Sequence, residues 1–143
     1  MCGQLLHLGW HGRPIETIVW GPGCYVVPRT DGTVLVGATV EEVGFDERAT
    51  SAGVRELLDA AGELLPESWG ATFLGARVGL RPATPDDLPI LGPDSRVPGV
   101  VYATGHYRNG VLLAPITARL IADWIADGAG DASFDALSVA RFR

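Results

Sequence analysis

Two arginines in glycine- and proline-rich stretches are the residues of this chain best suited to chemistry. Arg81 stands in GLRPATPDDLPILGP, and Arg108 stands in YATGHYRNGVLLAP. A guanidinium is planar and always charged, so it can hold a carboxylate through two parallel hydrogen bonds. The two segments therefore predict a pocket for a small carboxylate beside a large, planar, electron-poor cofactor.

A structural role for Arg81 is also open. The residue follows an apolar strand candidate that ends in Gly79 and Leu80, and it precedes Pro82. Two carboxylates, Asp86 and Asp87, lie close behind it in the sequence. Structural ion pairs are common, so an internal salt bridge to one of them is the alternative to substrate binding.

The loop from Gly105 to Gly110 connects an expected strand to an expected helix. Glycine at both ends lets the backbone approach a ligand closely, and a helix start presents unpaired N–H groups with positive character. Because the pattern is not GxGxxG, it favours an anionic ring edge or a carboxylate over a diphosphate. The alternative is a plain turn that exposes His106 and Arg108.

The remaining polar residues give little support to other chemistry. Tyr25 lies in the strand candidate CYVVP, where a tyrosine is usually a packing residue. The three histidines have no metal-site spacing, and the sequence contains no GxSxG, HExxH or P-loop. We therefore predict no metal site, and nothing favours a hydrolase or a nucleotide triphosphatase.

Composition places the chain among ordinary globular domains. It has 143 residues, a formal net charge of −6 and 47% hydrophobic residues. The negative charge argues against non-specific nucleic-acid binding. Cys2 and Cys24 lack metal or disulfide spacing, and neither a signal peptide nor a membrane span is present. These features predict a cytoplasmic protein with reduced cysteines.

Apolar runs between turn residues predict antiparallel strands in the first third of the chain. Asp31-Gly32 is a favoured hairpin turn between two of them. The acidic run 41–47 is expected to be a solvated loop, with a substrate-entry loop as the alternative. The expected strands are 4–8, 15–20, 24–28, 33–39, 69–80 (whole or broken) and 100–104.

Two helices complete the expected α+β fold. The first begins at a cap on Thr50 or Ser51, ends before Pro66 and covers one face of the antiparallel sheet. The second runs from about Gly110 to Ala126 and is apolar on all sides, so one face should meet another domain, another subunit or an identical chain. We expect a domain over residues 1–127 and a tail over 128–143, which Phe134 and Phe142 would anchor.

The order of four segments resembles the C-terminal part of the glycine oxidase and D-amino-acid-oxidase-like family of FAD enzymes. These segments are GQLLHL, GCYVVPRTDGTVLVGAT, GLRPATPDDLPILGP and YATGHYRNGVLLAPITARLIADWI. The resemblance implies the substrate domain of such a flavoenzyme, with the Rossmann half absent from these residues. A C-terminal fragment, a product of a split gene and a remnant all fit that expectation.

The resemblance also implies a reaction and a site. The family oxidises glycine, small amino acids or secondary amines by hydride transfer to FAD, with imine hydrolysis and H₂O₂ formation, and can serve thiamine biosynthesis. By motif, Arg81 would bind the substrate carboxylate, Tyr25 would assist it, and Arg108 would lie beside the substrate and the flavin. No residue is assigned as a catalytic base, because orientation and electrostatics suffice for a neutral amine. The residues assigned to the flavin are Gly79, His106, Asn109, Gly110, Val111 and Leu112.

Two functions from different classes follow. In the first, the chain works with a FAD-domain chain, or as a homo-oligomer through the apolar C-terminal helix, in an FAD-dependent amine oxidase. A proline- or sarcosine-type dehydrogenase is a variant of this function with another substrate and electron acceptor. In the second, the chain is a non-catalytic remnant or an oligomerising module that binds a small carboxylate at most.

Overall fold

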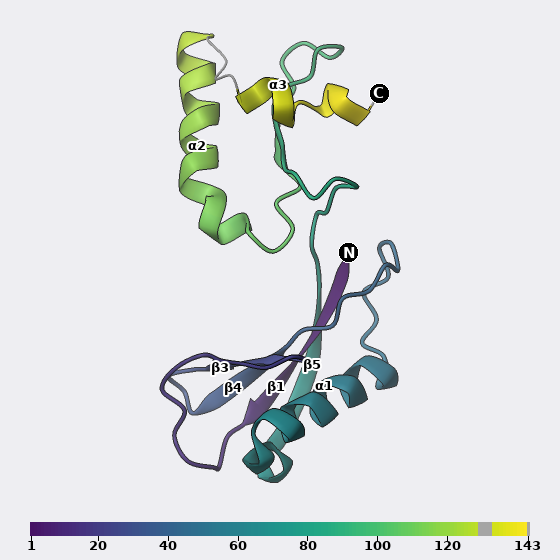
Figure 1. Cartoon of the computed structure of the whole chain (residues 1–143), viewed down its shortest axis with the longest axis vertical. Helices are drawn as coiled ribbons and strands as arrows, with labels where there is room; N and C mark the ends of the chain where they lie inside the picture. The colour runs from purple at the N-terminus through teal and green to yellow at the C-terminus, as the bar shows by residue number, and fades with distance from the viewer. Residues whose placement is uncertain (129–132, 143) are drawn as a thin grey trace. The chain divides into compact units, whose positions relative to one another are not determined.

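The computed structural model describes residues 1–128 and 133–142. Contacts divide the chain into two compact units, Met1–Leu80 and Arg81–Arg143. The sequence predicted a boundary at 127/128 instead, and that domain assignment stays a prediction. Figure 1 labels the main helices and strands of both units.

The first unit is built on a five-stranded antiparallel sheet with the strand order β2-β3-β4-β1-β5. The expected hairpin is confirmed: Arg29 donates its N–H to the Thr33 carbonyl at 2.9 Å, and Gly32 adopts φ +79° in the turn. The strands are β1 (Cys2–Gly9), β2 (Val19–Trp20), β3 (Tyr25–Pro28), β4 (Thr33–Gly37) and β5 (Thr72–Leu80).

Helix α1 (Ser51–Leu64) lies along one face of this sheet (Figure 1). Thr50 caps it by accepting the Gly53 N–H at 3.1 Å, as the sequence predicted. Leu57 and Ala61 of α1 are fully buried against the inward side chains of the strands. The expected covering helix is therefore confirmed, and the apolar stripe explains its position.

Pro66 begins a short 3₁₀ helix, η1 (Pro66–Gly70), after α1. The prediction of a strand from Trp69 was wrong at its start, because Trp69 belongs to η1 and β5 begins at Thr72. Proline fits the first turn of a helix, where no N–H donor is needed, and this favours the extra helical turn.

Gln4 ties β1 to the start of α1 through its fully buried side chain. Its Nε2 donates to Glu41 Oε1 at 2.8 Å and to Thr50 Oγ1 at 3.0 Å, and its Oε1 accepts the Thr50 N–H at 2.9 Å. These hydrogen bonds offset the free-energy cost of burying the amide, which would be large if the amide were unpaired. The loop 41–47 is consequently held at one end by Glu41, while Phe45 at its tip is exposed.

The second unit combines a two-stranded antiparallel sheet with helices. Strands β6 (Ile90–Pro93) and β7 (Val101–Thr104) pair with each other, and helix α2 (Gly110–Asp127) follows. Helix α3 (Ser133–Leu137) packs Phe134 against Gly92 of β6, and the short η2 (Val139–Phe142) ends the described chain. Part of the predicted tail, residues 129–132, lies outside the described residues.

Helix α2 carries no buried residue, although its sequence is rich in apolar side chains. None of the helices within 1–128 and 133–142 has the length and apolar character needed to cross a bilayer. An ordinary amphipathic helix buries its apolar face, whereas α2 buries none of its residues.

Candidate functional site

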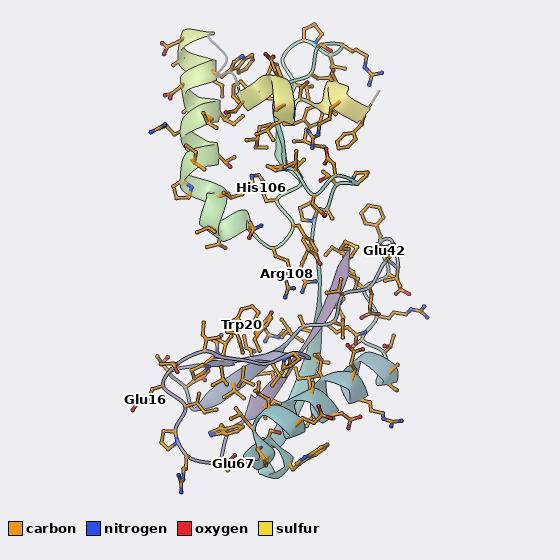
Figure 2. The ribbon with its side chains drawn as sticks, viewed as in Figure 1. Glu16, Trp20, Glu42, Glu67, His106 and Arg108 are labelled. Atoms are coloured by element: carbon orange, nitrogen blue, oxygen red, sulfur yellow. The ribbon has the colours of Figure 1, made fainter. Side chains whose placement is uncertain are left out.

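Tyr25 lies on the face of the first unit's sheet that points away from α1. Direct cross-strand partners place their side chains on the same face, so the pairing defines a row across five strands. This cross-strand row is Trp20, Tyr25, Gly37, Leu5 and Arg77. Figure 2 shows Trp20 on the side of the sheet opposite α1.

The Tyr25 ring is held from two sides. Its centroid lies 5.1 Å from that of Trp20, with the planes tilted by 43°. On the other side it lies over Gly37, where an added Cβ would sit only 2.6 Å from the Tyr25 hydroxyl oxygen. The absence of a side chain at Gly37 is therefore what lets the phenol lie across β4. Trp20 and Arg77 join Tyr25 on this face, and sequence reasoning missed both.

Gly79, predicted to contact the flavin, lies in β5 opposite Gly3. It is exposed, and an added Cβ would meet no atom within 4 Å. Gly79 and Tyr25 thus belong to the first unit, whereas the other seven predicted site residues belong to the second.

The two arginine segments are joined inside the second unit. Tyr107 donates its backbone N–H to the Pro82 carbonyl at 2.9 Å. The Arg81 guanidinium carbon lies 6.0 Å from the centre of the Tyr107 ring, at the outer end of the cation–π range. Gly105 adopts φ +79°, and an added Cβ would lie 2.8 Å from the Thr84 methyl. The loop 105–109 is thus packed closely onto the segment that follows Arg81.

Within that loop, His106 and Arg108 have different surroundings. The His106 Nε2 lies 2.9 Å from Thr117 Oγ1, so the imidazole is bonded to α2. Figure 2 shows the Arg108 side chain extending from the loop away from α2, and the residue is exposed. Arg108 can therefore reach a ligand, whereas one ring nitrogen of His106 is already used to hold the loop to the helix.

The start of α2 fits the edge of a ring that gains negative charge when it is reduced. Asn109 occupies the N-cap position but makes no side-chain capping bond, which leaves the first N–H groups of the helix without that partner. Val111 is 94% exposed and Leu112 is 77% exposed, so apolar surface flanks these donors. Donors and apolar side chains at one helix end suit a flavin whose pyrimidine edge gains negative charge on reduction.

Asp86 is engaged by Arg141, from near the end of the described chain. Arg141 Nε donates to Asp86 Oδ2 at 2.6 Å and Nη2 donates to Oδ1 at 3.2 Å. These hydrogen bonds lower the pKa of the Asp86 carboxyl to about 2. Because Arg141 occupies both oxygens of Asp86, the structure gives this carboxylate a partner other than Arg81. The residues are 55 positions apart, so no local pattern could have predicted the pair.

An open groove of about 510 Å³ runs along α2 in the second unit. Small side chains, which leave room along the helix, form most of its wall. The lining residues are Ala103, His106, Gly110, Ala114, Thr117, Ala118, Ile121, Ala122 and Ile125.

Metal and thiol chemistry receive no support from the described residues. Across 1–128 and 133–142, no three His, Cys, Asp or Glu side chains form a possible metal-binding group. Cys2 and Cys24 are both buried and free, and burial raises the pKa of the Cys24 thiol. A less acidic, buried thiol is a poor nucleophile at neutral pH.

Comparison with known proteins gives consistent results. The model of the FAD dependent oxidoreductase family matches residues 2–124. The chain is 45% identical over 130 residues to the bifunctional protein ThiO/ThiG of Trichormus variabilis, covering 91% of this chain and 20% of that protein. It is 41% identical over 109 residues to the glycine oxidase of Pseudomonas putida, covering 76% of this chain and 30% of that enzyme.

Solved structures agree. The crystal structure of glycine oxidase from Geobacillus kaustophilus matches with a TM-score of 0.82 and 37% identity, over 93% of this chain and 37% of that one. The chain therefore spans between a fifth and rather more than a third of the length of these relatives. The similarity extends through both units and includes the segments that carry Tyr25, Arg81 and Arg108.

Proposed function

This chain belongs to the FAD-dependent oxidoreductase family, and from that premise we propose that it forms the substrate-binding part of an amine oxidase of the glycine oxidase type. The observation that carries the proposal is the joining of both arginine segments at one place. Tyr107 bonds the Pro82 carbonyl and immediately precedes Arg108, and the same loop leads into the start of α2. The loop that carries Arg108 thus leads into the proposed flavin-facing helix start and is bonded to the segment that carries Arg81.

The arginines and the tyrosine have complementary tasks. Arg81 and Arg108 bind the substrate carboxylate by charge-assisted hydrogen bonds. Tyr25 keeps the assisting role that the family resemblance implies for its hydroxyl. Fixing the carboxylate in this way orients the Cα–H bond, and orientation is a large part of what such a reaction needs.

The start of α2 carries the proposed cofactor contact. The chemistry supplied by bound FAD is removal of a hydride from the substrate carbon; the imine is then hydrolysed, and O₂ takes the electrons as H₂O₂. The N–H groups at Gly110, Val111 and Leu112 stabilise negative charge at the flavin edge, with Asn109 and His106 holding the loop and Gly79 leaving room on β5. No side chain of the chain is proposed as a catalytic base.

Glycine is the proposed substrate, because the relatives include proteins named glycine oxidase. A role in thiamine biosynthesis belongs to the same proposal, supported by the similarity to a protein named ThiO/ThiG. Both cysteines are free, which is in keeping with a cytoplasmic site of action.

We further propose that α2 meets a partner: a FAD-binding domain, on the same or another polypeptide, or an identical chain. Support comes from a helix of 18 residues with no buried side chain and from the groove along it. Apolar surface of this kind is typical of a face that is covered in the working protein.

The test is a visible absorption spectrum with FAD present, recorded for the purified chain and for the chain mixed with the N-terminal part of the Geobacillus kaustophilus glycine oxidase. Protein-bound flavin bands that appear only in the mixture, together with glycine-dependent H₂O₂, would support the proposal. The matched variant is Arg81→Leu, expected to raise KM for glycine roughly a hundredfold or more, since a buried carboxylate loses its charge partner.

Failure of both samples to hold flavin would instead favour the second candidate, a non-catalytic oligomerising module. The unburied α2 is the observation that favours this candidate. Sedimentation would then show a concentration-dependent oligomer, and Ile125→Glu in the α2 groove would dissociate it.

A further inference from the structure

Tyr107 is the bulky residue in an unfavourable backbone conformation beside the candidate site. Its φ is +50°, in the left-handed region that residues with a Cβ seldom adopt. A strained residue of this kind persists only where its surroundings hold it. Two contacts hold Tyr107: its N–H bonds the Pro82 carbonyl, and its ring lies beside the Arg81 guanidinium.

The backbone contact restricts Arg81 from its carboxyl side. A residue before proline is confined to extended conformations, so Pro82 already limits the Arg81 backbone. The 2.9 Å hydrogen bond from Tyr107 then fixes the position of the Pro82 carbonyl. Close packing of Gly105 on Thr84 holds the loop to the same segment a few residues further along.

The side-chain contact restricts the guanidinium itself. The ring centre is 6.0 Å from Arg81 Cζ, and both residues are half-buried. A free arginine side chain has many rotamers, and an aromatic ring beside it removes those that would swing through the ring. Because Tyr107 directly precedes Arg108, its conformation also sets where the second arginine leaves the backbone.

We propose that Tyr107 is a positioning residue that orients Arg81 through its ring and fixes the spacing of Arg81 and Arg108. This inference rests on the proposed function for its consequence, which is a carboxylate site matched to a small acid. The phenol hydroxyl has no part in it, so phenylalanine should replace Tyr107 and leucine should not.

The experiment uses the purified full chain with ¹⁵N-labelled arginine. The Arg81 Nε–H signal is assigned by its loss in Arg81→Leu. In wild type and Tyr107→Phe its order parameter should lie in the rigid range, and in Tyr107→Leu it should fall below about 0.6. Tyr102→Leu, which removes a ring bonded to Asp94 elsewhere in the second unit, is the matched control and should leave Arg81 unchanged.

Glycolate, a carboxylate that lacks the amine, is titrated into the same proteins by calorimetry. Tyr107→Leu should raise its Kd roughly three- to tenfold, while Tyr107→Phe stays within about twofold of wild type. An Arg81 signal that stays rigid in Tyr107→Leu overturns the inference, and so does a Phe variant that behaves like the Leu variant. A Kd that Arg81→Leu leaves unchanged, or a wild-type chain that binds no glycolate, would instead refute the proposed carboxylate site and the consequence drawn from it.

Discussion

Alanine at two glycines of α1 should destabilise the protein to very different extents, although both positions are buried in the same helix. Gly53 lies against the fully buried side chain of Gln4, and Gly62 lies against the ring of Trp69. An added Cβ would clash with either neighbour. The outcome depends on which neighbour can move, and the structure distinguishes them clearly: Gln4 is 0% exposed, whereas Trp69 is 62% exposed.

Opposing contributions set the size of the effect at each position. Alanine in place of glycine favours a helix by roughly 0.5–1 kcal/mol. At Gly53 this gain is exceeded, because overpacking costs about 1–3 kcal/mol and displacing the Gln4 amide breaks hydrogen bonds worth about 1 kcal/mol or more each. We expect Gly53→Ala to lower the free energy of unfolding by roughly 2–4 kcal/mol. At Gly62 the tryptophan can swing outward, so the net change should stay within about 1 kcal/mol.

Urea unfolding followed by circular dichroism measures both variants under one set of conditions. Gln4→Ala in the Gly53→Ala background tests the cause, because removing the amide should make the two changes markedly non-additive. Equal destabilisation by Gly53→Ala and Gly62→Ala would refute the argument, since it would mean that burial of the neighbour does not decide the cost.

Three further predictions concern the candidate site and its supports. Gly37→Ala should displace the Tyr25 ring by roughly 1 Å, because the added methyl needs an ordinary carbon contact distance. Calorimetry should show weaker glycolate binding in this variant, and also in Tyr25→Phe, which leaves the ring in place. Because the pKa of Asp86 is lowered to about 2, its pair with Arg141 stabilises the fold when the carboxyl is ionised, and this stability should fade as the pH falls from about 4 to about 2. The urea midpoint of Arg141→Gln should lack this part of the acid dependence. Val111→Asp should leave the thermal midpoint nearly unchanged but weaken FAD retention in the reconstituted mixture roughly tenfold, because it places a negative charge at the exposed start of α2.

Local signals in the sequence were enough for much of the fold. Asp31-Gly32 predicted the hairpin, Thr50 predicted the cap of α1, and glycine at position 110 predicted the start of α2. Each of these depends on a few neighbouring residues, so a single sequence carries the information. The η1 turn was missed because Pro66 was expected only to end a helix, although proline also begins one.

Contacts between distant segments could not be predicted in the same way. The Gln4 network joins positions 37 and 46 residues apart, and Arg141 reaches Asp86 across 55. Nothing in the residue types says which of many carboxylates an arginine will find. The row containing Tyr25 and Gly37 is different, because the hairpin register follows from the position of its turn. The position of Tyr25 opposite Gly37 could therefore have been deduced from the sequence.

The placement of the three proposed carboxylate ligands has a physical consequence of its own. Arg81 and Arg108 belong to one compact unit and are joined by the Tyr107 backbone, whereas Tyr25 belongs to the other unit. Two arginines on segments that one backbone hydrogen bond joins can both act on the same carboxylate. Binding of a simple carboxylate should therefore depend mainly on the arginine pair, so Arg81→Leu should weaken glycolate binding more than Tyr25→Phe does.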